Sequence, residues 1–147
     1  MKINVSTVLP APRDRVFAAL VDPDVLRRAI PGCETLTATA ADEYAATLKV
    51  GVAGLKGSYT GKAAVRAKQP PDSLTLTFEG KGAPGFVRGS AALRLSTEGD
   101  ATRVTSEADV MCGGLIASVG SRLIEAAAKK LSEDFFRQLG RELGATT

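Results

Sequence analysis

The opening of the chain alternates between apolar and polar residues, which predicts a half-buried strand. Over Lys2–Leu9 every second residue from Ile3 onward falls on one side, and most of these residues are apolar. A period of two is the spacing of a strand that turns one face toward a core. Pro10 and Pro12 then end the strand, because proline has no N–H to donate to a neighbouring strand.

Helical spacing replaces the alternation directly after these prolines. Arg13–Val21 carries apolar residues three and four positions apart, which predicts a first short helix. A second short helix is expected over Pro23–Ile30, because Asp22 can cap its N-terminus and proline suits the first helical position. Two short helices are therefore expected after the first strand.

Six more alternating segments follow, and residues typical of turns separate them. They are Leu36–Thr39, Tyr44–Val52, Ser58–Ala67, Ser73–Gly80, Phe86–Ser96 and Thr102–Cys112. Such a succession predicts an antiparallel meander that buries one face and needs an apolar layer across it.

From Gly114 the apolar residues recur at helical spacing and predict one long helix that closes the chain. The expected fold class is α+β, with a curved seven-stranded antiparallel sheet wrapped around this C-terminal helix. Phe135 and Phe136 are neighbours on the helix and point about 100° apart. One of them is therefore expected in the core, and the other at the surface near Arg122 and Lys129.

Length and composition fit one folded domain spanning residues 1–147. The chain has 44% hydrophobic and 24% charged residues, as globular proteins do. Its net charge of +3 comes from 19 basic and 16 acidic residues without a long run of one sign, so nucleic acid is not expected as a partner. No segment matches a signal peptide or a membrane span, and the expected location is the cytoplasm.

The chain has no histidine, which is the commonest general base and metal ligand of enzymes. Gly80–Gly85 matches G-x-G-x-x-G, and residues 57–63 are similar to a P-loop, but both lie in strand patterns. A phosphate site of either type needs a helix to begin at the glycines. Nucleotide binding, a metal site and a covalent cofactor are therefore not expected.

One of the two cysteines follows a proline and a glycine. Pro31 ends the second helix, and Gly32 can take the positive φ that reverses the chain before Cys33. A reactive thiol needs a base or a cation to lower its pKa. Arg27 and Arg28 are near in sequence, so a catalytic or redox thiol stays open, but a buried structural thiol is the favoured interpretation.

The inward faces of the predicted strands are rich in glycine and alanine, and the chain has no tryptophan. A curved sheet with such small residues can leave a cavity under the long helix, or it can let the helix pack directly on the sheet. Both alternatives stay open. The inward-facing residues of the strands carry no charge, so a ligand would be apolar and held by burial. Burial contributes roughly 25 cal/mol of free energy per Å² of apolar surface removed from water. A phenylalanine at Gly61 is expected to fill such a cavity without unfolding the domain.

Candidate ligand-binding residues come from the inward strand faces and from the apolar stripe of the helix. They are Leu48, Val50, Tyr59, Gly61, Leu76, Phe78, Gly89, Ala91, Ile116, Val119 and Leu123. No catalytic residue is expected among them.

Several stretches together point to a known family. The most specific is DPDVLRRAIPGCE, residues 22–34, followed by GLKGSYTG, residues 54–61, with support from GLIASVGSRLI and FFRQL further on. In these stretches the chain resembles the carbon monoxide dehydrogenase G-subunit family, within the START-like (SRPBCC, helix-grip) superfamily of ligand-binding domains. The resemblance implies a single START-like domain with an apolar cavity between sheet and helix. It also implies that the segment around Cys33 is a hinge without a nucleophile.

The resemblance further implies a non-enzymatic accessory function. Members of the family accompany molybdenum-containing hydroxylases of the carbon monoxide dehydrogenase type and are linked to the attachment of these dehydrogenases to the cytoplasmic membrane. The implied ligand is a respiratory isoprenoid quinone, bound non-covalently. Members often continue past the long helix into a tail that contributes to attachment, whereas this chain ends at Thr147. Transient contact with the inner face of the membrane is therefore expected.

Two other functions stay open. An enzyme of the same superfamily, such as an aromatase or cyclase, could use Tyr59, Tyr44 or an acidic group in the pocket as a proton donor. A protein-interaction module would instead have a filled core and dock its partner on an exposed helix face.

Overall fold

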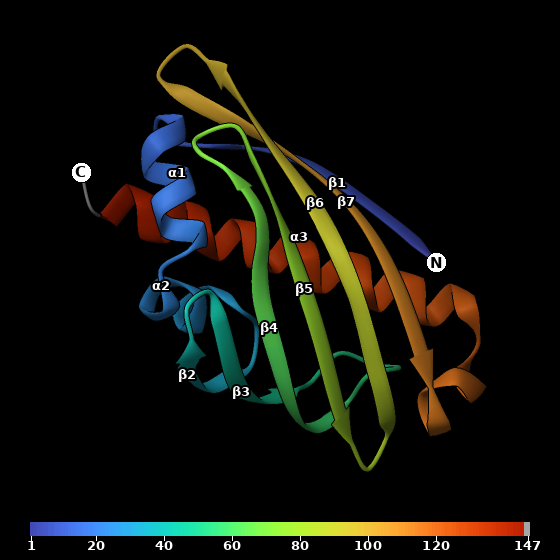
Figure 1. Ribbon diagram of the computed structural model, residues 1–147. Helices are drawn as coiled ribbons and strands as arrows, with labels where there is room; N and C mark the ends of the chain where they lie inside the picture. Colours follow the sequence, from blue (N-terminus) through green and yellow to red (C-terminus); the bar gives the residue numbers. More distant parts are fainter. Residues whose placement is uncertain (146–147) are drawn as a thin grey trace.

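The computed structural model describes residues 1–145, in which seven antiparallel strands form a curved sheet around a long helix (Figure 1). The strands are β1 (Lys2–Leu9), β2 (Cys33–Ala40), β3 (Glu43–Val50), β4 (Gly57–Gln69), β5 (Ser73–Gly82), β6 (Gly85–Glu98) and β7 (Ala101–Gly113). The helices are α1 (Arg13–Leu20), α2 (Pro23–Ala29), the 3₁₀ helix η1 (Gly114–Val119) and α3 (Ser121–Ala145). The predicted fold class is confirmed.

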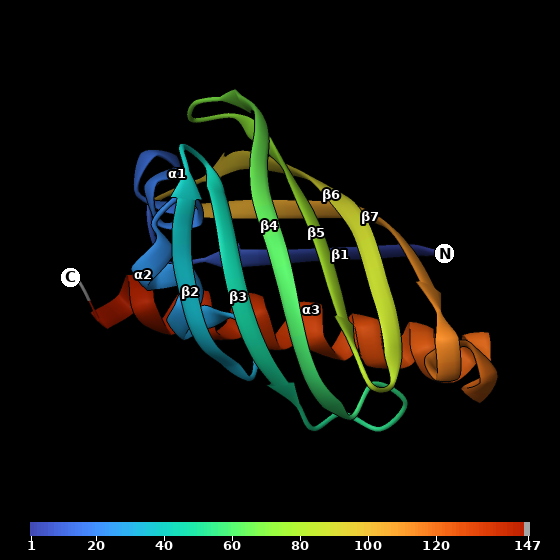
Figure 2. The same cartoon turned by 60° about the horizontal axis from the view of Figure 1, so that its bottom comes forward.

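The first strand pairs with the last one and not with the second. The strand order is β1-β7-β6-β5-β4-β3-β2, and the β1–β7 register runs from Lys2 opposite Asp109 to Leu9 opposite Thr102. β1 and β2 are therefore the two edges of the sheet, and α1 and α2 connect them in the chain (Figure 2). Because α3 contacts both β1 and α2, it lies across the open side of the curved sheet.

Both ends of α2 are set by residues with a specific backbone role. The Asp22 carboxylate accepts a hydrogen bond of 2.9 Å from the backbone N–H two residues on, and Pro23 occupies the first helical position. Gly32 has a φ of 74°, and a Cβ at this position would overlap the carbonyl oxygen of Lys49. The reversal therefore requires glycine, and β2 begins at Cys33, earlier than the alternation predicts.

The long helix does not begin at Gly114, where the helical spacing predicts its start. η1 occupies residues 114–119, and Gly120, with a φ of 99°, separates it from α3. Such a φ lies outside the α-helical region. The break leaves Leu115, Val119 and Leu123 exposed instead of extending the buried stripe of α3. No helix within residues 1–145 combines the length and the apolarity that are needed to cross a bilayer.

Two clusters of buried side chains hold the two halves of α3. The larger cluster joins the C-terminal half of α3 to α1, α2 and the sheet. The smaller cluster joins the N-terminal half of α3 to η1, β4 and the β3–β4 loop through Leu55, Tyr59, Ile116, Ile124 and Ala127. The helix is thus anchored on both sides of its midpoint.

Thr102 on β7 is a buried polar residue that strand alternation does not single out. It is fully buried, and its hydroxyl donates a hydrogen bond of 2.7 Å to the carbonyl of Ala11.

Thr102→Val is expected to lower the free energy of unfolding by about 1–3 kcal/mol, because the carbonyl loses its partner. Urea unfolding measures this loss. Thr105→Val, on the opposite face of the same strand, is the control and is expected to change stability by less than about 0.5 kcal/mol; equal losses in the two variants would contradict the prediction.

Candidate functional site

A cavity of about 330 Å³ lies between the concave face of the sheet and α3. Strands β2 to β7 supply one wall, and the end of α2, the β3–β4 loop and the middle of α3 supply the others. Small-molecule sites in proteins span about 300–1,000 Å³, so this cavity falls at the lower end of that range.

Seven of the eleven predicted ligand-binding residues line the cavity. They are Leu48, Val50, Tyr59, Gly61, Leu76, Phe78 and Ala91. All seven lie on β3 to β6, where a period of two places alternate residues on one face. The sheet therefore brings the strand part of the predicted site together, and a role of these residues in binding stays a prediction.

The other four predicted residues lie outside the lining. Gly89 is adjacent to it, since a Cβ at this position would lie 3.0 Å from the Cζ atom of Phe78. Ile116 is buried in the smaller cluster, and Val119 and Leu123 are exposed. The expectation that Val119 and Leu123 face the cavity is wrong, because it assumed a helix without the break before α3.

Most of the helical side of the cavity was not anticipated from the sequence. Leu26 and Ile30 at the C-terminal end of α2 and Leu36 on β2 line it. Phe135 also lines it beside Phe136, with ring centroids 5.1 Å apart and an interplanar angle of 73°. The expectation that one phenylalanine is surface-exposed is therefore wrong, because α3 packs inside a concave sheet that contacts more than one of its faces. The spacing of Leu26 and Ile30 is the sequence signal that could have located this wall.

Most polar groups at the cavity are bonded to the backbone or lie at the surface. The Tyr59 hydroxyl donates a hydrogen bond of 2.7 Å to the carbonyl of Leu55, and burial raises the pKa of this hydroxyl. The Ser132 hydroxyl donates to a carbonyl one turn earlier, at 2.9 Å. The two charged residues of the lining, Lys62 and Glu79, are exposed. The interior can therefore hold a ligand by burial and shape more than by charge.

Gly61 contributes its backbone to the lining and has no room for a side chain. A Cβ there would overlap the carbonyl oxygen of Glu79 on the neighbouring strand. The expectation that phenylalanine at Gly61 fills the cavity without unfolding is therefore wrong, because β5 would have to move. Ala46, opposite Gly61 in the β3–β4 register, lines the cavity and already carries a Cβ. Ala46 is the better position for a larger side chain.

Nearly the whole chain, from residue 6 to residue 144, matches one family model. That model is CoxG, which describes the G subunit of carbon monoxide dehydrogenase. The chain belongs to the CoxG family. The resemblance inferred from the sequence is therefore confirmed over nearly its full length.

Solved structures have the same fold. A conserved protein from Geobacillus kaustophilus is 31% identical in sequence, with a TM-score of 0.94 over 99% of this chain and 97% of that chain. A START superfamily protein from Mycobacterium smegmatis has 12% identity and a TM-score of 0.79, with 99% of each chain covered. At that identity the likeness shows the START-like fold alone. Among curated proteins, none matches this chain.

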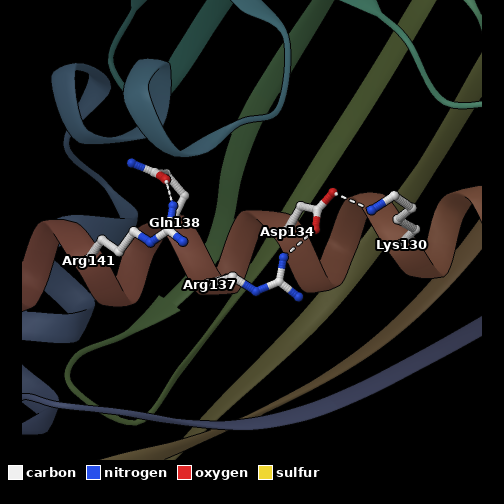
Figure 3. A network of polar contacts seen from close by, with 5 residues as sticks. All are labelled: Lys130, Asp134, Arg137, Gln138 and Arg141. Carbon is white, nitrogen blue, oxygen red and sulfur yellow. Dashed lines mark hydrogen bonds and ion pairs between the residues drawn. The ribbon is translucent and has the colours of Figure 1, made fainter.

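A second, polar cleft of about 590 Å³ lies behind the cavity wall, and Ile30 and Pro31 line both spaces. The cleft is rich in arginine side chains from α2 and α3. Figure 3 shows its network on α3, where the Asp134 carboxylate accepts hydrogen bonds from Arg137 at 2.6 Å and Lys130 at 3.3 Å. The bond from Arg137 is the larger cause that lowers the pKa of Asp134. Exposed pairs of this kind contribute at most about 1 kcal/mol each.

Cys33 of this CoxG-family chain lies in the polar cleft and not in the apolar cavity. Burial raises the pKa of its thiol, and the nearby Arg27 offsets this only in part. The thiol donates to the carbonyl of Thr35, with 3.4 Å between sulfur and oxygen. A raised pKa leaves little thiolate at neutral pH, which favours the structural interpretation of Cys33.

We expect Cys33 to react slowly with iodoacetamide at neutral pH. The reaction needs thiolate, and both the raised pKa and the partial burial of Cys33 reduce its rate. In a Cys112→Ser background the rate should be severalfold below that of free cysteine, and it should recover when the protein is unfolded in urea. A folded-state rate equal to or above that of free cysteine would indicate a reactive thiol.

Proposed function

We propose that this chain is a non-enzymatic carrier of an apolar ligand such as an isoprenoid respiratory quinone. In this proposal it accompanies a molybdenum-containing hydroxylase of the carbon monoxide dehydrogenase type and links that dehydrogenase to the membrane. The observation that carries the proposal is the cavity under α3, whose charged lining residues are exposed while its interior is apolar. Membership of the CoxG family supports the choice of partner.

Burial supplies the affinity for such a ligand. Removing about 300 Å² of apolar surface from water at roughly 25 cal/mol per Å² corresponds to about 7.5 kcal/mol before the loss of freedom on binding is subtracted. Phe78 on the sheet and Phe135 and Phe136 on α3 line the cavity, and aromatic side chains suit the faces and edges of a planar ring. Ser106, buried on β7, adds a hydroxyl to the lining, which can donate to a quinone carbonyl.

The redox step belongs to the partner in this proposal. The dehydrogenase supplies two electrons, and two protons enter with them, so that the bound quinone leaves as quinol. The carrier contributes the apolar site, the orientation of the ring and exclusion of water from it. Its own residues change neither oxidation state nor covalent bonding.

The geometry of the tyrosines favours a carrier over an aromatase or cyclase. Tyr44 donates its hydroxyl hydrogen to the carbonyl of Val21 at 3.2 Å, as Tyr59 does to the carbonyl of Leu55. Burial raises the pKa of both hydroxyls, which makes them weaker acids. The cavity itself favours a carrier over an interaction module with a filled core.

Solvent extraction of the purified protein, followed by mass spectrometry, is expected to detect an isoprenoid quinone at up to one molecule per chain. The apolar cavity is the reason, because a ligand buried there exchanges slowly with water. The same extraction is repeated on protein that was purified without detergent and then incubated with quinone. Background levels in both preparations would contradict the carrier function.

Ala46→Phe is expected to abolish quinone binding by occupying the cavity, while the fold persists. Ala45→Phe is the matched control, because Ala45 is the next residue on β3 and faces the other side of the sheet. Quinone binding is measured by the same extraction, and folding by the thermal midpoint. If both variants bound quinone equally with unchanged midpoints, the ligand would not occupy this cavity.

A further inference from the structure

Five of the six large hydrophobic side chains that are exposed in the described residues lie at one end of the molecule. These five form the apolar tip: Phe86, Met111, Leu115, Val119 and Leu123. Leu115 is 72% exposed and Met111 55% exposed. Single exposed apolar residues are ordinary, whereas a group of them marks a contact surface.

Three segments that are distant in sequence meet at the tip, namely residues 51–57, 81–88 and 111–123. The N–H of Ile116 in η1 donates to the carbonyl of Pro84 in the β5–β6 turn, at 2.8 Å. Gly54 in the β3–β4 loop packs against Leu123, where a Cβ would come within 3.1 Å of the leucine Cγ. In Figures 1 and 2 all three segments lie at the end of the sheet where the orange η1 is drawn.

The same three segments carry four basic residues and no acidic one. All four are exposed: Lys56, Lys81, Arg88 and Arg122. Removing them from the 19 basic residues of the chain leaves 15 against 16 acidic ones, so the positive excess of the chain resides at the tip. The Arg88 guanidinium lies over the Phe86 ring, 5.5 Å from its centroid, and 3.4 Å from the Met111 sulfur. Cations and apolar side chains therefore share one surface.

We propose that the apolar tip docks on the surface of a bilayer that contains anionic phospholipids. The leucine, valine, phenylalanine and methionine side chains enter the boundary between headgroups and acyl chains. The four cations lie at the level of the phosphates. Leu115 and Val119 on η1 are the central contacts of this surface.

Charge and side-chain type favour lipid over protein as the occupant of the tip. Lysine is depleted in the cores of protein–protein interfaces, whereas segments that lie in a membrane interface combine bulky apolar side chains with flanking Lys and Arg. Each basic residue close to an anionic leaflet strengthens binding by about fivefold. The three segments contain no acidic residue, and the nearest ones in sequence, Glu79, Asp109 and Glu125, each lie two residues outside them.

One layer of side chains separates the tip from the cavity. Leu55 and Tyr59 line the cavity and also pack with Ile116 and Ile124 in the smaller cluster. When the tip is docked, this layer faces the acyl chains, and its displacement lets an apolar ligand pass between bilayer and cavity without crossing water. This entry route rests on the proposed carrier function, and docking itself rests on the proposed link with the membrane.

Co-sedimentation of the full chain with vesicles tests docking. Vesicles of phosphatidylcholine alone are compared with vesicles of phosphatidylcholine and phosphatidylglycerol in equal amounts. The wild-type chain is expected to sediment with the anionic vesicles and to be released as salt is added. Leu115→Asp and Val119→Asp are each expected to lower the fraction bound by about tenfold, because a carboxylate enters neither the acyl boundary nor an anionic surface readily.

Val8→Asp is the matched control for Val119→Asp. Val8 on β1 is 45% exposed and Val119 is 43% exposed, so the two substitutions have the same chemistry at different places on the molecule. Lys56→Glu and Arg122→Glu are likewise compared with Arg94→Glu on β6, outside the three segments. The controls are expected to bind anionic vesicles as the wild-type chain does. Equal effects at Val8 and Val119, or no sedimentation of the wild-type chain, would overturn the proposal.

Loading of the cavity separates the docking proposal from the carrier function. The menaquinone with four isoprenoid units is supplied either in anionic vesicles or in detergent micelles. Val119→Asp is expected to load severalfold more slowly from vesicles and at the wild-type rate from micelles. A wild-type chain that docks but loads from neither source would overturn the carrier function alone. Tip variants that keep vesicle binding but lose association with the dehydrogenase would make the tip a protein interface and overturn the docking proposal.

Discussion

The site depends on how α3 is held across the open side of the sheet. The helix contacts β1 at one edge, and it contacts α2, which leads into β2, at the other edge. Opposite its middle the sheet carries small residues, among them Ala46, Gly61, Ala63 and Ala91. A helix fixed at both edges cannot move into the centre of a curved sheet to replace the missing side-chain volume. The cavity follows from this restraint together with the small residues of β3 to β6.

The size of the cavity gives this restraint an energetic consequence. Cavities made by truncating core side chains destabilise a protein by about 24 cal/mol per Å³. The apolar lining of the space of about 330 Å³ between sheet and helix loses van der Waals contacts in the same way where no atoms face it. An apolar occupant that restores the lost contacts therefore stabilises the folded chain as well as binding to it. The two buried clusters, one on each side of the midpoint of α3, hold the helix at its distance from the centre of the sheet.

Strand alternation was sufficient to predict the sheet and the strand part of the site, because side-chain direction in a strand follows from position alone. The helical part could not be predicted in this way. The direction of Phe135 depends on how deeply α3 lies in the concave sheet, and the contribution of Leu26 depends on where two short helices pack. The start of the long helix was missed because helical spacing continues through η1 in the sequence, whereas Gly120 interrupts it in the backbone. Family resemblance named the fold but not these local departures.

The interruption at Gly120 gives η1 a buried side and an exposed side that a continuous helix would not combine. A continuous helix would place Ile116, Val119 and Leu123 on one stripe, at spacings of three and four, and would bury them together. In η1, Ile116 is buried against Leu55 and Tyr59, while Val119 remains at the surface. One side of this short helix thus packs behind Leu55 and Tyr59 at the end of the cavity, and the other side supplies the most exposed part of the apolar tip. Because these two surfaces belong to the same six residues, a force that moves the outer surface also moves the inner one.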